Sequence, residues 1–154
     1  MITPCRDMSI IEEFMMLPEV RRYAEEYGSA TPKFEASKKE LWFTFRKSGE
    51  AAGMINMHVE TGSMCQFHPY ILRKHRMNYV EMVREFFGWF IKTMPPEAIK
   101  LNAIIPSCYK ATIDAGIEAG GTVEGVDRMS YRKDESKVYD RILLGITRQE
   151  MSNG

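Results

Sequence analysis

The most regular pattern of apolar and polar positions lies between Cys65 and Ile91. Its first part, Cys65 to Leu72, is a short run of apolar and aromatic residues, which is typical of a β-strand. After a basic turn, apolar residues recur with charged residues between them, at Val80, Val83, Phe86, Phe87, Phe90 and Ile91. This spacing predicts an amphipathic helix that follows the strand closely.

The turn between this strand and this helix is basic, from Arg73 to Arg76. Asn78 favours a helix start, and Glu81 three residues later completes a capping box, so we expect the helix to begin there. The start of a helix carries free backbone amides and a partial positive charge. Together with the basic turn, this predicts a seat for a phosphate group.

Turn residues divide the rest of the chain into short segments. Ser9 with Glu12 forms a second capping box, and Pro18 suits the first turn of a helix. Gly49 is placed to join two strands into a hairpin, and Pro95 ends the long helix. The remaining runs predict strands at 1–3, 41–45, 51–59, 99–105, 122–132 and 137–147, and helices at 10–16, 19–26 and 107–119.

The predicted order of elements is β-α-α-β-β-β-α-β-α-β-β. Strands and helices alternate in the second half, so we expect an α/β protein, a mixed sheet with helices on both faces. The length of 154 residues suits one domain, 1–154.

Charge and cysteine content narrow the function classes. Lys and Arg number 21, as do Asp and Glu, and the zero net charge argues against non-specific nucleic-acid binding. Three unpaired cysteines and three histidines favour no metal site. The odd cysteine count without an export signal favours a reducing, cytoplasmic location. No apolar run reaches the ~20 residues of a membrane span, so we expect no membrane contact.

The order of elements resembles the GNAT fold, that of the general-control-related N-acetyltransferases. The family's central strand, basic turn and long helix correspond to Tyr70–Glu81. Its next strand and helix correspond to Asn102–Pro106 and Ser107–Ala119, and its glycine step into the last hairpin to Gly120–Thr122. The closing run Tyr139–Arg148 looks like that of a divergent bacteriophage-encoded group, whose members would lie in the host cytoplasm or the virion.

The resemblance implies transfer of an acetyl group from acetyl-CoA to an amine on a small molecule or protein. The family's phosphate loop, R/Q-x-x-G-x-G/A, would begin at Arg76 and place its two small positions at Tyr79 and Glu81. Backbone amides of the central strand would polarise the thioester carbonyl. The resemblance assigns cofactor binding to Ile71, Leu72, Arg73, Lys74, His75, Arg76, Met77, Asn78 and Tyr79.

The candidate catalytic residues are His68 and Tyr109. His68 lies in the central strand, from which the resemblance implies a general base for the amine; the alternative is a hydrogen-bonded packing residue. His58, on the neighbouring strand, is a second candidate base. Tyr109 can protonate a departing thiolate or simply pack. The family's usual tyrosine would fall at Gly116.

Two other functions stay open. A GNAT-shaped protein without catalysis, acting as a virion or host-interaction component, is favoured by Tyr79, Glu81 and Gly116, which depart from the family pattern. A nucleic-acid-binding module using the basic turn is disfavoured by the zero net charge.

Aromatic residues crowd the long helix. Consecutive helical positions diverge by about 100°, so they cannot all face one core. We therefore expect some of the four rings to leave the main core and pack on a second layer or on a partner subunit of a homodimer, among Phe86, Phe87, Trp89 and Phe90.

Overall fold

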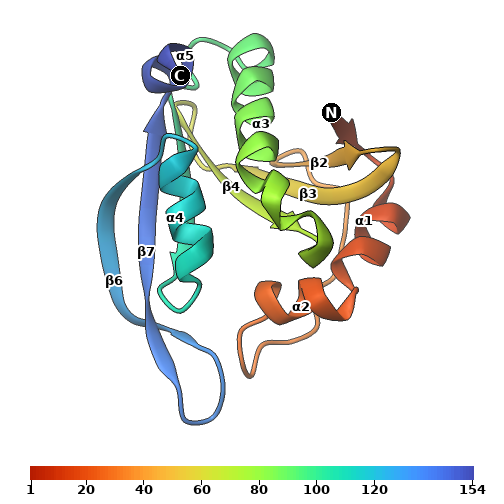
Figure 1. Cartoon of the computed structure of the whole chain (residues 1–154), viewed down its shortest axis with the longest axis vertical. Helices are drawn as coiled ribbons and strands as arrows, with labels where there is room; N and C mark the ends of the chain where they lie inside the picture. The colour runs from red at the N-terminus through yellow and green to blue at the C-terminus, as the bar shows by residue number, and fades with distance from the viewer.

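The computed structural model describes all residues, 1–154, and Figure 1 shows one sheet with helices packed on it. The elements are β1 Ile2–Cys5, α1 Met8–Met15, α2 Pro18–Ala24, β2 Glu40–Lys47, β3 Glu50–Val59, β4 Met64–Ile71, the 3₁₀ helix η1 Arg73–Asn78, α3 Tyr79–Thr93, β5 Lys100–Pro106, α4 Lys110–Glu118, β6 Thr122–Arg132, β7 Val138–Thr147 and α5 Arg148–Asn153. The predicted α/β order is confirmed, and η1 and α5 are added to it.

The seven strands form one sheet in the order β1-β2-β3-β4-β5-β7-β6. Every neighbouring pair is antiparallel except β4 and β5, which run parallel. These two strands pair only from Met64 to Gln66 against Lys100 to Asn102. Beyond Gln66 they diverge, and the sheet is split into two halves at one end.

The main core lies between the sheet and α3. The aromatic rings of α3 pack on the strands. Phe86 is stacked on Phe67 at 5.5 Å, and Trp89 meets Phe43 edge-on at 4.4 Å, both between ring centroids. Phe86, Phe87 and Phe90 are buried, and Trp89 packs on the same cluster. The expectation that some rings leave the main core was therefore wrong, because Trp89 reaches back over Phe43, and the homodimer loses that support.

A second core lies on the opposite face of the sheet. Here α1 and α2 bury Ile11, Phe14 and Val20 against Trp42 and Met54. The predicted placement of helices on both faces is confirmed. It leaves the splayed ends of β4 and β5 between the two helical layers.

Two helix starts differ from the prediction, and a third, that of α3 after Asn78, is confirmed in position but lacks the predicted capping bond. Asp7, not Ser9, caps α1, since it accepts the Ser9 backbone N–H at 2.9 Å. Asn78 makes no capping bond, because η1 already supplies upstream carbonyls and the Tyr79 N–H donates to the Arg76 carbonyl. The fourth helix begins at Lys110 rather than at Ser107.

The C-terminal helix α5 was not predicted. Thr147 and Glu150 cap its start, and Figure 1 places it beside the end of α3. The Arg148 guanidinium donates to four carbonyls around that end, at 2.5 Å from Ile91, 3.1 Å from Met94, 3.2 Å from Pro95 and 3.0 Å from Ala98. The helix closes the open end of the core.

Candidate functional site

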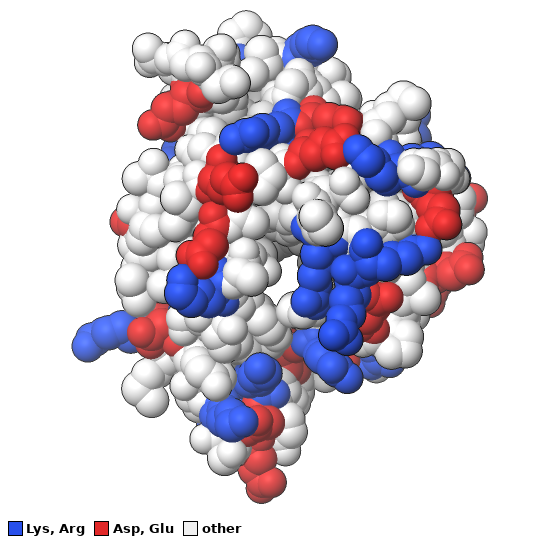
Figure 2. All heavy atoms as spheres, in the orientation of Figure 1, with Lys and Arg blue, Asp and Glu red and all other residues white.

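A cleft of about 780 Å³ opens where β4 and β5 diverge. One wall is β4 from Phe67 to Ile71, and the other is β5 from Ala103 to Pro106 with the start of α4. The segment from Val20 to Pro32 closes its remaining side. Figure 2 shows an opening near the middle of this face, with Lys and Arg side chains gathered along one border.

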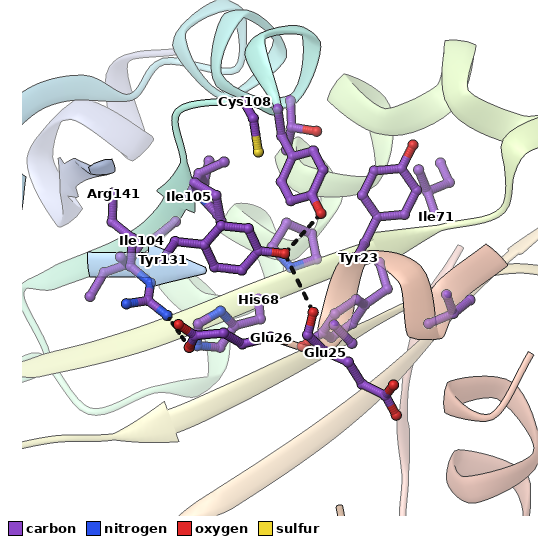
Figure 3. A pocket seen from close by; sticks show the side chains of 18 of the residues that line it. Tyr23, Glu25, Glu26, His68, Ile71, Ile104, Ile105, Cys108, Tyr131 and Arg141 are labelled. Carbon is purple, nitrogen blue, oxygen red and sulfur yellow. Dashed lines mark hydrogen bonds and ion pairs between the residues drawn. The ribbon is translucent and has the colours of Figure 1, made fainter. Parts of the chain in front are cut away.

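The structure places His68 in this cleft (Figure 3). It lies opposite Asn56 in the β3–β4 pair. Burial lowers the pKa of the His68 imidazole, the positive charge of His58 lowers it further, and Glu60 opposes the shift. The ring is therefore neutral at pH 7, which is the form that accepts a proton.

The second candidate base, His58, lies outside the cleft. Its two ring nitrogens lie 3.8 Å from a carboxylate oxygen of Glu40 and 3.7 Å from one of Glu60. His58 is on the same face of the sheet as His68, near enough to lower its pKa, but it is not part of the cleft lining.

Tyr109 also lines the cleft, in a group of three tyrosines. Its hydroxyl shares a hydrogen bond of 3.0 Å with that of Tyr131, and its ring lies 4.9 Å from that of Tyr23 between centroids. Burial, and next the bond to Tyr131, raise the pKa of the Tyr109 phenol. The phenol keeps its proton at neutral pH, as a proton donor must.

Position 116 faces β7 rather than the large cleft. A Cβ atom at Gly116 would lie 2.7 Å from the Leu144 Cδ1 atom. The glycine lines only a small second cavity of about 20 Å³ beneath α4. Its absence of a side chain allows α4 to approach β7 closely.

Three of the nine residues assigned to cofactor binding line the cleft, namely Ile71, Arg76 and Tyr79. The Arg76 guanidinium lies 5.3 Å from the Tyr23 ring centroid and bonds its hydroxyl. It brings a positive charge to the cleft where η1 meets α3.

The other six residues of the turn point elsewhere. The Arg73 backbone N–H donates to the Glu19 carboxylate at 2.7 Å, while Lys74 and His75 face Glu50 on β3. Met77 is 99% exposed. Leu72 packs on the second core, and Asn78 caps nothing. The 3₁₀ turn spreads these side chains around its axis.

Neither departure from the phosphate-loop pattern places a charge in the cleft. The Tyr79 ring is buried in the main core, and burial raises the pKa of its phenol. The Glu81 carboxylate pairs with Lys47 at 2.6 Å, towards the β2–β3 hairpin. A bound anion in the cleft therefore does not face the Glu81 charge directly.

Sequence reasoning missed the residues that close the cleft. Figure 3 shows Glu25 and Glu26, which follow α2, beside Tyr131 and Arg141 from β6 and β7. Glu26 pairs with Arg141 at 2.9 Å. No local pattern marks these residues, because more than a hundred positions separate the partners and only the tertiary fold joins them.

Two further features bear on the chemistry. The structure holds no group of three or more His, Cys, Asp or Glu side chains placed to bind a metal ion. None of its helices has the length and apolar character needed to cross a membrane.

No protein-family model and no curated protein matches this chain, but solved structures do. A spermidine N-acetyltransferase from Vibrio cholerae, in complex with CoA and spermine, has a TM-score of 0.81 at 10% identity, with 99% of this chain and 98% of that chain covered. A GNAT acetyltransferase from Streptococcus pneumoniae reaches 0.63 at 16% identity over 73% and 69% of the two chains. One from Bacillus anthracis reaches 0.60 at 13% identity over 72% and 67%. The chain therefore has the fold of the GNAT acetyltransferases, as its order of elements predicted.

Proposed function

We propose that this protein is an N-acyltransferase that moves an acetyl group from acetyl-CoA to an amine. The single observation that carries the proposal is the cleft between β4 and β5, in a fold shared along nearly its whole length with a CoA-bound acetyltransferase. The cleft contains a neutral imidazole and a protonated phenol. These groups suit proton transfer to and from an amine and a thiolate.

The residues present fit the cofactor. Beyond Gln66, the edge of β4 that faces β5 has no strand partner. Its free backbone groups suit the amide groups of a pantetheine arm, much as a sheet edge accepts a peptide. Arg76 would hold a phosphate through a charge-assisted hydrogen bond, and Ile71 and Tyr79 would form the wall beside it. The cofactor, when bound, would supply the acetyl group as a thioester.

His68 and Tyr109 take the two proton-transfer roles in this proposal. His68 accepts the proton of the acceptor amine, since its lowered pKa keeps the imidazole neutral. Tyr109 donates its phenolic proton to the leaving sulfur, and the Tyr131 hydroxyl orients it at 3.0 Å. Backbone N–H groups of β4 would polarise the thioester carbonyl, except at Pro69, which has none.

The remaining basic residues would act at longer range. Arg73, Lys74 and His75 lie next to the cleft but are engaged by carboxylates or turned away. The charges of Arg73 and Lys74 would attract an anionic cofactor without contacting it. The acceptor amine, the phage-encoded group, the cytoplasmic or virion location and the homodimer stay predictions. The likeness to acetyltransferases gives no support to a non-catalytic role.

Calorimetry with acetyl-CoA tests the proposal. We expect binding in the micromolar range, and Arg76→Met should weaken it by about tenfold or more, because one charge-assisted bond is lost. Arg128→Met, which removes an exposed charge on β6 with no bonded partner, is the matched control and should bind like the wild type. Absence of binding at high micromolar acetyl-CoA would refute the proposal.

A further inference from the structure

The mouth of the cleft, where β4 and β5 are farthest apart, is closed by a segment from another part of the chain. Residues 22–27, the end of α2 and the turn after it, reach β6 at Tyr131 and Arg132. We call this contact the bridge. It joins the two halves of the sheet at the end where strand pairing does not.

Backbone groups and one carboxylate hold the bridge. The Tyr27 N–H donates to the Arg132 carbonyl at 3.0 Å. The Glu26 carboxylate accepts the Arg132 N–H at 2.9 Å and, through its other oxygen, the Arg141 guanidinium at 2.9 Å. Glu26 is thus the central residue, since it fixes both β6 and β7 to the segment after α2.

Two tyrosine hydroxyls add weaker bonds to the same segment. The Tyr131 hydroxyl lies 3.4 Å from the Glu25 carbonyl, and the Tyr109 hydroxyl lies 3.3 Å from the Arg22 carbonyl. Since the two hydroxyls also bond each other and have two protons between them, one donates to its carbonyl while the other donates to its neighbour. Figure 3 shows the first of these bonds together with the Glu26–Arg141 pair. Contacts from β6, from β7 and from the residue that precedes α4 therefore close the mouth.

Without the bridge, the gap between β4 and β5 would be open at its wide end. The bridge closes that end, so the cleft becomes a passage with walls on all sides. Its walls are β4, β5 with α4, the paired end at Gln66–Asn102, and the bridge itself. The lining runs from Arg76 and Ala115, beside α3 and α4, to Ala30 and Pro32 after α2. Helices α3 and α2 pack on opposite faces of the sheet, so the passage leads from one face to the other.

We propose that this passage restricts the acceptor to slender, unbranched primary amines that reach His68 end-on. The inference rests on the proposed function. A side approach through the mouth is blocked by the bridge, so a bulky group next to the amine collides with it. Lysine side chains on folded surfaces of other proteins are poor acceptors for the same reason.

At the mouth of the cleft, the amine is selected by the width of the group next to its nitrogen rather than by its charge. The bridge contains two carboxylates, and each has its own cationic partner. Glu26 pairs with Arg141 at 2.9 Å, and Glu25 pairs with Arg21 at 2.6 Å. The mouth therefore offers no unpaired carboxylate to a second ammonium group. Linear monoamines and linear polyamines should both be accepted.

Hydrogen exchange tests the bridge without any substrate. The amides of Tyr27 and Arg132 are bonded in the bridge, so they should exchange slowly in the wild type. Glu26→Ala should speed exchange at Arg132 by about tenfold or more, as one bond to a charged group is lost. Glu135→Ala, an exposed turn carboxylate, should leave it unchanged. Fast exchange at both amides in the wild type overturns the bridge.

The rate of thiol release from acetyl-CoA, measured with different amines, tests this selection of the acceptor. Hexylamine and spermidine are the slender amines, and cyclohexylamine has as many carbons as hexylamine but a bulky ring next to the nitrogen. We expect the wild type to favour hexylamine over cyclohexylamine by about tenfold or more. Glu26→Ala should reduce the ratio of the rate with hexylamine to the rate with cyclohexylamine. Tyr131→Phe, which keeps the shape of the core, should reduce this ratio less.

The outcomes separate the two proposals. If acetyl-CoA does not bind in calorimetry, the proposed function fails, and the exchange data still report on the bridge alone. If acetyl-CoA binds but the bulky amine reacts as fast as the slender one, or no slender amine reacts, the selection is overturned and cofactor binding stands.

Discussion

At the scale of single residues, His68 links the site to stability. Burial lowers its pKa below the ordinary value of 6.5, with His58 adding to the shift and Glu60 opposing it. Between the folded-state pKa and 6.5 the unfolded chain binds more protons than the folded one, so stability rises with pH across this window. The free energy of unfolding should therefore fall as the pH drops from 6.5 through the folded-state pKa of His68.

Urea unfolding at a series of pH values measures this slope. His68→Gln has no titrating ring and should flatten the curve in that window. Carboxylates with lowered pKa, such as Glu26 and Glu150, lose their contributions only below about pH 4.5, so they do not obscure it. An unaltered slope in His68→Gln would show that this imidazole is not the group responsible.

The resemblance to the GNAT fold drew attention to His68 and Tyr109, and both line the cleft because each lies in or beside a strand that the sequence marks clearly. Reasoning from the sequence missed Glu26, Tyr131 and Arg141, which meet across the cleft mouth. Their roles come from tertiary contacts between segments whose local sequence is that of ordinary polar turns and an edge strand. No pattern within a short window can report such a contact.

At the scale of elements, most strands and helices could be predicted, because burial imposes a period of two or of 3.6 residues. The starts of α2 and α3 were also predicted, but the starts of α1 and α4 and the capping bonds were not. Asn78 and Glu81 form a capping-box pattern, yet η1 supplies the upstream carbonyls and Glu81 turns to Lys47 instead. Helix α5 was missed, since its helical residues are few and its anchor is Arg148 on the distant end of α3.

Arg148 gives a prediction at this scale. Arg148→Met should lower the free energy of unfolding by about 2 kcal/mol, because carbonyls at the end of α3 lose a charged donor. Arg148→Lys should recover only part of this, as one ammonium group cannot reach four carbonyls. Urea unfolding measures both, with Arg128→Met as the control for loss of an exposed charge. Equal stability of Arg148→Met and the wild type would contradict this role.

At the scale of the whole molecule, the proposed cofactor would bind between two halves of the sheet that share only three paired positions. Ligand that binds only the folded state stabilises it by mass action. CoA at a hundredfold excess over its Kd should raise the free energy of unfolding by about 2.7 kcal/mol. Thermal unfolding with and without CoA measures this, and Arg76→Met should show a smaller rise in Tm at the same CoA concentration. No shift in the wild type would contradict specific binding.

The short parallel seam between β4 and β5 also bears on how the chain is synthesised. As the ribosome releases the chain, β1 to β4 and α3 emerge before β5, the strand that pairs with the free edge of β4. Until Lys100 and the following strand arrive, β4 is a bare sheet edge, and such edges invite pairing with other nascent chains. The gap that would receive a cofactor in the finished protein is thus, during translation, an unpaired edge of a half-built sheet.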